Sequence, residues 1–468
     1  MKSQPLVTIY VPCRNYGRYL EQAVESVFSQ VYCNWELIII DEGSSDSTIP
    51  IAEKLVSKYP SKVSLIKNST PMGLQKLANH VLSIANGKYM MRLDADDWLD
   101  EAAVFLMVNR LESSDNAGMV YGNYYYTDPK GKVIDVEFRH KLGAEDLAGH
   151  LPPHGACTLF RTRSLKVVGG YSEDIDAQDG WDLWFKLVDR IGAISIQTPV
   201  FYYRQHGKSL SRDNKRLLNA RSKIFADIAS KLEGDYQPSI AAVIPVRESY
   251  PNFEGVPYQD INGRSILELA IISAAKSNRI STIIVSSESQ RVLDYSKKLE
   301  SDGKVPEHQR LLRKTSDTSD GIPIRDFMFI AGEGHAEIHN SFPDIVIYLS
   351  LHAINRTEDH IDNALNVLRI TESDSVVSVQ EEREPMFHHG KHGLDLINPG
   401  RFQDLTFDKE RLYRFNGSLI ATWWESLKLH SLFGEKTSYI EMSREDSLQI
   451  KSQQSLNLLK ANEMQTLL

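Results

Sequence analysis

The stretch Tyr89-Met90-Met91-Arg92-Leu93-Asp94-Ala95-Asp96-Asp97-Trp98-Leu99 decides how the first half of this chain folds. It joins an apolar, strand-like run to three carboxylates within four residues. If the strand ends before this cluster, its carboxyl end carries Asp94 and Asp96 toward one side of a turn, where their oxygens can hold Mg²⁺ or Mn²⁺ against a diphosphate. The alternative is a solvated turn in which Asp97 or Asp100 caps the following helix.

The residues before this stretch alternate between strand and helix patterns. The expected elements are a strand at 7–11, a helix at 19–30, a strand at 36–40 and a helix at 48–59. Continuous apolar strands are typical of a parallel sheet covered on both faces, and ligands of such sheets bind beyond the carboxyl ends of the strands. Asp41 and Asp94 both stand at expected strand ends, so we expect a ligand site at one edge of an α/β sheet.

The pattern restarts after a polar segment rich in turn-forming residues at 233–239. The next expected elements are a strand at 240–245, a helix at 265–277 and strands at 282–286, 345–349 and 375–379. The sequence therefore predicts two tandem α/β domains of the nucleotide-binding type. Their expected bounds are 1–232 and 240–468, with a linker at 233–239.

The composition excludes several classes of protein. The 468 residues carry a formal net charge of −9, which argues against binding to nucleic acid. The three cysteines are too few and too scattered for a disulfide framework or a paired zinc site, so a cytoplasmic location is expected. Because no apolar run approaches about 18 residues, we expect no transmembrane segment, while peripheral membrane contact stays open.

Four motifs follow one another in the first half of the chain. They are VTIYVPCRNYGRYLEQAVESVFSQ, ELIIIDEGSSDST, GLQKLANHVLSIANGKYMMRLDADDWL and HGACTLFRTRSLKVVGGY with AQDGWDLWFKL. In this order they closely resemble family 2 glycosyltransferases of the GT-A fold, as far as about residue 210. The resemblance implies transfer of a sugar, with inversion, from a nucleotide diphosphate donor to a hydroxyl. The implied acceptor is a surface glycan or its lipid-linked precursor.

The resemblance also implies which residues bind the donor. Pro12, Arg14 and Asn15 stand in the loop where the family receives the nucleotide. Asp41 matches the aspartate that recognises the base, although its position also suits a helix cap. These four positions make up the expected nucleotide end of the site.

The diphosphate end of the site is implied by two further segments. Asp94 and Asp96 match the family's DxD motif, which grips diphosphate and the metal, here Mg²⁺ or Mn²⁺. In YYRQHGKSLSRDN, Arg204 would neutralise the diphosphate and His206 would join the metal shell. A plain surface histidine is the alternative for His206.

Transfer needs a general base, because an acceptor hydroxyl is a weak nucleophile at pH 7. Asp179 in AQDGWDLW falls where the family keeps its catalytic carboxylate, and Asp182 competes for the role. Gln178 replaces an acidic neighbour that is common in the family, and Gly180 lengthens the turn. Both aspartates therefore stay candidates for the base. The alternative is that they have a structural role at the start of a helix.

A second set of motifs spans 240–460: AAVIPVRE, INGRSILELAI, TIIVSSES, KTSDTSDG, DSVVSVQEERE, YRFNGSLIATW and EDSLQIKSQQSLNLLK. It resembles the cytidylyltransferases that make CMP-activated acidic sugars such as sialic acids and Kdo. The resemblance implies the fold, a homodimer through this domain, and a ligand pocket that includes Arg247, Asp317, Arg356 and Asn416.

This second domain departs from the family at the positions that carry its chemistry. Glu248 and Glu254 stand where the triphosphate must approach, and Gln449 and Lys451 replace the aspartates that bind Mg²⁺. We therefore expect a degenerate, non-catalytic binding domain. Two alternatives stay open: a bifunctional glycosyltransferase and CMP-sugar synthetase, or a non-enzymatic scaffold that only binds nucleotide sugars.

Overall fold

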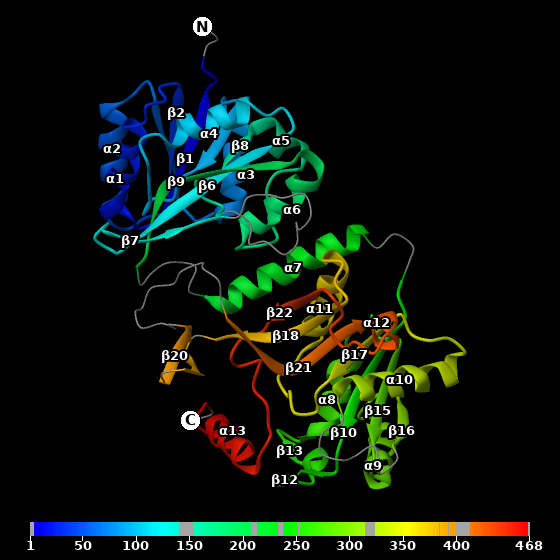
Figure 1. The fold of residues 1–468 in the computed structure, drawn as a ribbon. Coiled ribbons are helices and arrows are strands. Elements are labelled where there is room, and N and C mark those ends of the chain that lie inside the picture. Colours follow the sequence, from blue (N-terminus) through cyan, green and yellow to red (C-terminus); the bar gives the residue numbers. More distant parts are fainter. Residues whose placement is uncertain are drawn as a thin grey trace. The chain divides into compact units, whose positions relative to one another are not determined.

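The computed structural model describes residues 4–139, 154–206, 213–232, 237–250, 253–313, 323–382, 384–391, 393–398 and 412–466. The chain divides into two compact units, Met1–Ile224 with Glu384–Glu410, and Phe225–Arg383 with Arg411–Leu468. Both units combine helices with a central sheet, which confirms the α/β class (Figure 1). The domain boundary at 233–239 stays a prediction, because 233–236 lie outside the described residues.

The first unit is built on a nine-stranded sheet. Its strands are β1 (Val7–Cys13), β2 (Trp35–Glu42), β3 (Val63–Asn68), β4 (Tyr89–Arg92), β5 (Trp98–Leu99), β6 (Met119–Thr127), β7 (Val133–Glu137), β8 (Leu159–Arg161) and β9 (Ala193–Arg204). Its helices are α1 (Gly17–Phe28), α2 (Thr48–Lys58), α3 (Leu74–Ile84), α4 (Ala103–Glu112), α5 (Thr162–Val167) and α6 (Asp179–Ile191). Helix α7 (Asn214–Leu232) runs past the point where the units divide.

The sheet order is β3-β2-β1-β4-β8-β6-β9-β5, with β7 paired to β6. Strands β3, β2, β1 and β4 are parallel, whereas β8 is antiparallel to both β4 and β6. The carboxyl ends of β1, β2 and β4 therefore share one edge, where Asp41 and Asp94 lie. The short strand β5 directly follows the acidic cluster, so the next helix begins only at Ala103.

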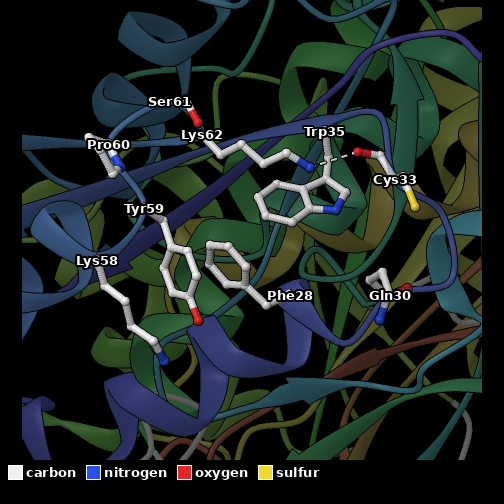
Figure 2. A pocket seen from close by; sticks show the side chains of 9 residues that line it. All are labelled: Phe28, Gln30, Cys33, Trp35, Lys58, Tyr59, Pro60, Ser61 and Lys62. Atoms are coloured by element: carbon white, nitrogen blue, oxygen red, sulfur yellow. Dashed lines mark hydrogen bonds between the residues drawn. The ribbon is translucent and has the colours of Figure 1, made fainter.

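The amino-end edge of the same strands carries a cavity of about 380 Å³ between the ends of α1 and α2 (Figure 2). Trp35, the first residue of β2, lies on it. Because a strand rises about 3.3 Å per residue, Trp35 and Asp41 are about 20 Å apart along β2. The cavity and the acidic edge are thus at opposite ends of the sheet.

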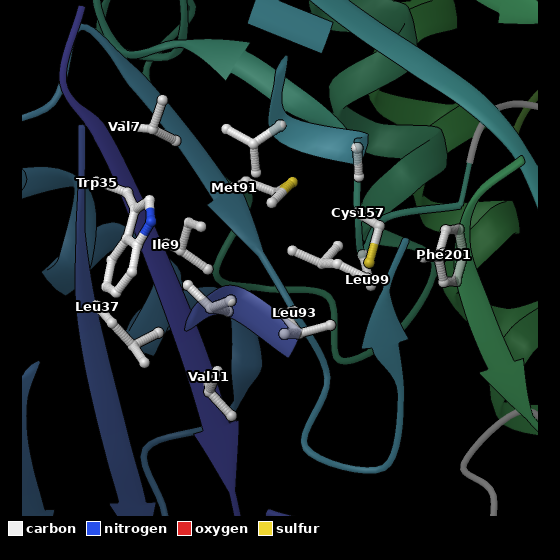
Figure 3. Packing of buried hydrophobic residues seen from close by; sticks show 14 of the residues in the cluster. Val7, Ile9, Val11, Trp35, Leu37, Met91, Leu93, Leu99, Cys157 and Phe201 are labelled. Atoms are coloured by element: carbon white, nitrogen blue, oxygen red, sulfur yellow. The ribbon is translucent and has the colours of Figure 1, made fainter. Parts of the chain in front are cut away.

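The core of the first unit lies on both faces of the sheet. Alternate residues Val7, Ile9 and Val11 of β1 pack on one face with side chains of the neighbouring strands β2 and β4 (Figure 3). On the other face, Tyr10 packs in a second cluster with Leu77 of α3. Side chains alternate across a strand, so β1 is buried on both sides, as its continuous apolar sequence predicted.

The second unit is built on a seven-stranded sheet of order β16-β15-β10-β17-β21-β18-β22. These strands are β10 (Ile240–Val246), β15 (Thr282–Ser287), β16 (Gln309–Leu312), β17 (Ile345–Leu349), β18 (Ser375–Glu381), β21 (Tyr413–Trp423) and β22 (Thr437–Glu441). The helices are α8 (Ile266–Ala275), α9 (Gln290–Ser301), α10 (Ile324–His339), α11 (Glu358–Ile370), α12 (Trp424–Lys428), α13 (Gln453–Thr466) and the 3₁₀ turn η2 (Val256–Tyr258). Strand β21 runs antiparallel between β17 and β18.

Three small hairpins complete the described structure. They pair β11 (Ser249–Tyr250) with β12 (Phe253–Glu254), β13 (Asp260–Ile261) with β14 (Arg264–Ser265), and β19 (Met386–Gly390) with β20 (Gly393–Asn398). None of the helices within the described ranges has both the length and the apolar character that a membrane crossing requires.

Replacement of Gly87 by alanine tests the packing of β4 against β1. A Cβ at Gly87 would lie 2.5 Å from the backbone nitrogen of Thr8 and 2.5 Å from the backbone oxygen of Tyr89. Because backbone cannot yield as a side chain can, we expect Gly87→Ala to lower the free energy of unfolding by about 1–3 kcal/mol. Scanning calorimetry measures this loss.

The control is the same substitution at Gly334 in α10, where the nearest atom to an added Cβ is a leucine methyl at 3.8 Å. Alanine is the better helix former, so Gly334→Ala is expected to leave stability unchanged or to raise it by up to about 1 kcal/mol. A Gly87→Ala protein as stable as the wild type would contradict this account of the β1–β4 contact.

Candidate active site

One buried arginine joins the two acidic positions of the site. Arg92 is the last residue of β4, and its side chain is 5% exposed. Its Nε lies 2.9 Å from Asp94 Oδ1, and its Nη1 lies 2.6 Å from Asp179 Oδ2. The end of β4, the acidic turn and the start of α6 are therefore linked by two ion pairs through a single guanidinium.

Burial and the neighbouring charges have opposite effects on the pKa values of Arg92 and Asp94. Burial alone would lower the pKa of Arg92, but Asp179 and Asp94 hold that pKa well above its ordinary value. Burial raises the pKa of Asp94, while the positive charge of Arg92 opposes the rise. A buried charge is tolerated only when it is paired, so the charge of Arg92 requires a carboxylate and both carboxylates depend on this one cation.

The second aspartate of the DxD motif contacts the end of β9. Asp96 Oδ2 lies 2.8 Å from Nε2 of His206, and the ring of His206 stacks on Tyr19 with 5.7 Å between centroids. Asp96 and His206 offer one oxygen and one nitrogen donor. In the part of the chain that the structure describes, no group of three or more His, Cys, Asp or Glu side chains is placed to hold a metal ion.

Arg204 supports this turn from β9. Its Nε donates to the backbone oxygen of Asp96 at 2.8 Å, and its Nη2 donates to Oε1 of Gln22 at 2.6 Å. The guanidinium also lies over the rings of Tyr19 and Trp98, at 4.5 and 4.7 Å from their centroids. Arg204 is 3% exposed, so its contacts fix the turn, and a direct contact with diphosphate stays a prediction.

The two candidates for a helix cap behave differently. Asp97 is 1% exposed, and its Oδ1 accepts a hydrogen bond from the backbone nitrogen of Arg204 at 2.9 Å. Burial, reinforced by the charges of Asp96 and Asp94, raises the pKa of Asp97 well above its usual range. Asp100 instead accepts from the backbone nitrogen of Ala102 at 3.1 Å, just before α4.

The two candidate bases have unlike surroundings. Asp179 opens α6, and a Cβ added to Gly155 would lie 2.5 Å from its Oδ2, so a glycine backbone packs directly against this carboxylate. Asp182 accepts hydrogen bonds from the backbone and hydroxyl of Ser172 at 2.9 and 2.8 Å, and it pairs with Lys186 at 2.9 Å. The oxygens of Asp182 are thus engaged in holding α6.

The expected nucleotide loops are tied to each other at the same edge. Asp41 is 1% exposed and accepts from the backbone nitrogens of Gly43 and Ser44, both at 3.2 Å. The backbone nitrogen of Asn15 donates to Oγ of Ser44 at 2.9 Å, and the side-chain oxygen of Asn15 accepts from Ser45 at 2.7 Å. The loops after β1 and β2 therefore form one connected surface.

The remaining donor candidates flank this surface. Pro12 pairs in register with Ile40 inside the sheet, and Arg14 is exposed in the loop that follows β1. The structure thus brings Asn15 and Asp41 together through Ser44 and Ser45, and it joins Asp94 to Asp179 through Arg92.

Arg92 is the site residue that sequence reasoning missed. The signal was present, because a cationic side chain inside an apolar run ahead of an acidic cluster requires a buried partner. Sequence spacing does not identify that partner, since Asp179 follows 87 positions later.

In the second unit, Arg356 is a buried cation whose recorded partners are neutral oxygens. It is 3% exposed and donates from Nη1 to the backbone oxygens of Ser350 and Ser418 at 2.9 and 3.1 Å, and from Nη2 to Oγ of Ser273 at 3.1 Å. Burial lowers the pKa of Arg356 to about 10. Asp317, another expected pocket residue, lies outside the described residues.

Asn416 lies in a polar network within β21, where the pairing of this strand with β18 is irregular. Its Oδ1 accepts from Oγ of Ser378 at 2.6 Å, and its Nδ2 donates to Oγ of Ser447 at 2.9 Å. Gln449, at one of the expected metal positions, donates its side-chain amide to the backbone oxygen of Asn416. Lys451, at the other, is exposed.

The loop after β10 carries its own counter-charges. Arg247 directly follows this strand, and the next residue, Glu248, lies 3.0 Å from Nη1 of Arg291. Glu288 pairs with Arg313 at 2.9 Å, and the side chain of Arg313 is 1% exposed. Carboxylates of the chain itself therefore engage two of the arginines near the ends of β10 and β15.

Solved structures and curated sequences are similar to parts of this chain. The TarS protein of S. aureus, solved in complex with UDP-GlcNAc, is 16% identical with a TM-score of 0.40, over 49% of this chain and 67% of that one. The mannosyltransferase PcManGT of Pyrobaculum calidifontis, solved with GDP-Man and Mn²⁺, is 17% identical with a TM-score of 0.37, over 49% and 65%.

Among curated sequences, the chondroitin synthase of Pasteurella multocida is 29% identical over 217 residues, 45% of this chain and 22% of that protein. The putative glycosyltransferase EpsE of Bacillus subtilis is 37% identical over 125 residues, 26% of this chain and 45% of that protein. The chain spans between 21% and 30% of the length of the first three curated relatives that it matches. Residues 8–169 match the family model described as glycosyl transferase family 2.

Proposed function

We propose that this protein is a GT-A-type glycosyltransferase that moves a sugar from a nucleotide diphosphate donor to a hydroxyl during synthesis of a surface polysaccharide. The observation that carries the proposal is the Asp94–Arg92–Asp179 triad at the carboxyl edge of the first sheet, in a unit whose residues 8–169 match the family 2 model. It links a carboxylate suited to the diphosphate end of a donor with a carboxylate suited to proton removal. Relatives named chondroitin synthase and hyaluronan synthase support a polysaccharide product.

The donor would lie along the carboxyl edge of β2, β1 and β4. Asp41, held by the loop after β2, would accept hydrogen bonds from the base, and Arg14 and Asn15 would flank the nucleotide. The diphosphate would then reach the turn that carries Asp94 and Asp96. Parallel strands deliver these groups to one edge, which is the usual ligand position in such sheets.

The residues at this turn fit a divalent cation. Asp96 supplies an oxygen and His206 a nitrogen only 2.8 Å apart, so a small ion can contact both after a slight separation. Mg²⁺ and Mn²⁺ commonly take one or two protein ligands and complete their shells with phosphate oxygens and water. Asp96 and His206, with Asp94 beside them, would hold the ion, which when bound offsets negative charge on the departing diphosphate.

Asp179 is the base in this mechanism. The acceptor oxygen forms a bond to the anomeric carbon, the bond from that carbon to the diphosphate breaks, and the hydroxyl proton passes to an Asp179 oxygen. A single displacement of this kind inverts the anomeric centre. Arg92 positions Asp179, while the contacts of Asp182 to Ser172 and Lys186 favour a structural role for Asp182.

For the second unit we propose a binding role without catalysis. Glu248 and Glu288 already pair with Arg291 and Arg313, which would otherwise be free to meet a triphosphate. The Mg²⁺ implied by the cytidylyltransferase resemblance does not fit Gln449 and Lys451, because that ion requires hard, anionic oxygen ligands. The alternative of a second, CMP-sugar-forming activity is therefore disfavoured.

The matched pair Asp179→Asn and Asp182→Asn tests the base. The donor is first identified by testing UDP-, GDP-, dTDP- and CMP-sugars with the wild-type chain in the presence of Mn²⁺. With that donor, Asp179→Asn is expected to lower kcat about 10²–10⁴-fold, the usual contribution of a general base. The KM for the donor should change little. Asp182→Asn should retain kcat within a few-fold and lose stability. A larger loss of kcat in Asp182→Asn would contradict the assignment.

Substitution of Arg92 tests the triad as a unit. Arg92→Met leaves two carboxylates without their buried cation, so we expect the free energy of unfolding in urea to fall by about 3–5 kcal/mol. The control is Arg216→Met, which removes an ion pair to Asp176, a carboxylate that is 73% exposed. Loss of such a surface pair typically costs at most about 1 kcal/mol. Equal losses in the two variants would count against a buried triad.

Pyrophosphate release tests the second unit. The full chain, mixed with CTP, Mg²⁺ and a panel of acidic sugars including sialic acid and Kdo, is expected to release no pyrophosphate above the rate without enzyme. Sustained release that survives Asp96→Asn would establish the bifunctional alternative, because that variant disables only the first site. The non-enzymatic scaffold is excluded if the wild-type chain cleaves a nucleotide sugar and Asp96→Asn does not.

A further inference from the structure

The cavity between the ends of α1 and α2 lies at the edge of the sheet away from the acidic turn. Figure 2 shows the side chains that line it. Its volume of about 380 Å³ falls within the usual range for small-ligand sites, about 300–1,000 Å³. It is formed by the last turns of α1 and α2 and the first residue of β2. Because about 20 Å separates it from Asp41 along β2, its ligand cannot be the reacting part of the donor.

Three aromatic rings form one wall of this cavity. Phe28 stacks on Tyr59 with 3.6 Å between ring centroids, and it meets Trp35 edge to face at 4.8 Å. Trp35 is 5% exposed, so it fixes this wall to the sheet, while Phe28 and Tyr59 are partly exposed. The three rings thus pack against one another and form an apolar wall.

Two ammonium groups lie against the same rings. Nζ of Lys62 lies 4.2 Å from the centroid of Trp35 and donates to the backbone oxygen of Cys33 at 2.9 Å. Nζ of Lys58 lies 4.8 Å from the centroid of Tyr59. The residues that line the cavity include two lysines and neither aspartate nor glutamate, although the chain as a whole is acidic. Because Lys58 also pairs with Glu25 at 2.7 Å, Lys62 supplies the net positive charge of this aromatic cavity.

We propose that this cavity is an exosite for an acidic sugar unit, a pyranose that bears a carboxylate, within the glycan on which the enzyme acts. The C–H face of a pyranose matches the aromatic wall, and its carboxylate matches the ammonium group of Lys62, with Lys58 as a second cation that it would share with Glu25. The inference rests on the proposed glycosyltransferase function. A glycan of several sugars bound at this edge would keep its growing end close to the enzyme between transfers.

Calorimetric titration of the full chain tests the exosite. The probe is a size-defined oligosaccharide of alternating glucuronate and N-acetylhexosamine, and the second probe is the same oligosaccharide with its carboxylates reduced to alcohols. We expect the acidic probe to bind, the reduced probe to bind at least tenfold more weakly, and added salt to weaken the acidic probe. The double variant Lys58→Ala, Lys62→Ala should lose at least tenfold in affinity.

Lys54→Ala is the matched control. Lys54 pairs with Glu21 as Lys58 pairs with Glu25, across the same two helices, but Lys54 does not line the cavity. Its substitution should leave the affinity unchanged. Equal affinity for the two probes, binding indifferent to the double substitution, or displacement of the acidic probe by inorganic phosphate or UMP at equal concentration would overturn the proposal.

Kinetic measurements distinguish failure of the exosite proposal from failure of the glycosyltransferase function on which it rests. The double variant is expected to keep the wild-type rate of donor cleavage and of transfer to a monosaccharide, while its KM for a long acidic acceptor rises about tenfold or more. A wild-type chain that fails to cleave any donor would refute the glycosyltransferase function, whatever the titration shows. An unchanged KM for the long acceptor, in an active enzyme, would refute the exosite alone.

Discussion

The buried guanidinium of Arg92 is the constraint on which the first unit depends. It sits at the end of β4, almost fully shielded from water, and it pairs with a carboxylate on the acidic turn and a carboxylate at the start of α6. Replacing Arg92 by a neutral residue would leave these two carboxylates without their shared cation. The ion pairs therefore fix both the path of the turn and the position of α6, two segments separated by more than eighty residues.

The same constraint places both acidic positions of the proposed transfer reaction at one edge of the sheet. Asp96 and His206 lie 2.8 Å apart where we propose that a cation and a diphosphate bind, and Arg204 supports this turn from β9. Asp179 lies across the shared arginine, beside a glycine backbone. In the second unit, ion pairs at the ends of β10 and β15 engage arginines of the chain itself. Both units are α/β sheets, but the charged groups at the ends of their strands are paired differently.

Much of the fold could be predicted from local patterns, because buried parallel strands are continuous apolar runs. The expected strand at 36–40 appears as β2, and the strand at 345–349 appears as β17 with the same bounds. The antiparallel insertion of β8, the short β5 and the partner of Arg92 could not be predicted, since each depends on contacts between distant segments. The acidic turn was recognisable in sequence, whereas the separate surroundings of Asp179 and Asp182 follow only from tertiary structure.

We propose that the chain has one metal-assisted donor site, at the turn that carries Asp94 and Asp96. Electron paramagnetic resonance of Mn²⁺, titrated into the full chain with and without UDP or GDP, counts the bound ions. We expect one bound Mn²⁺ per chain, only in the presence of a nucleoside diphosphate, and we expect Asp96→Asn to lose it. Nucleotide-dependent Mn²⁺ binding that persists in Asp96→Asn, or a second Mn²⁺ per chain, would contradict it.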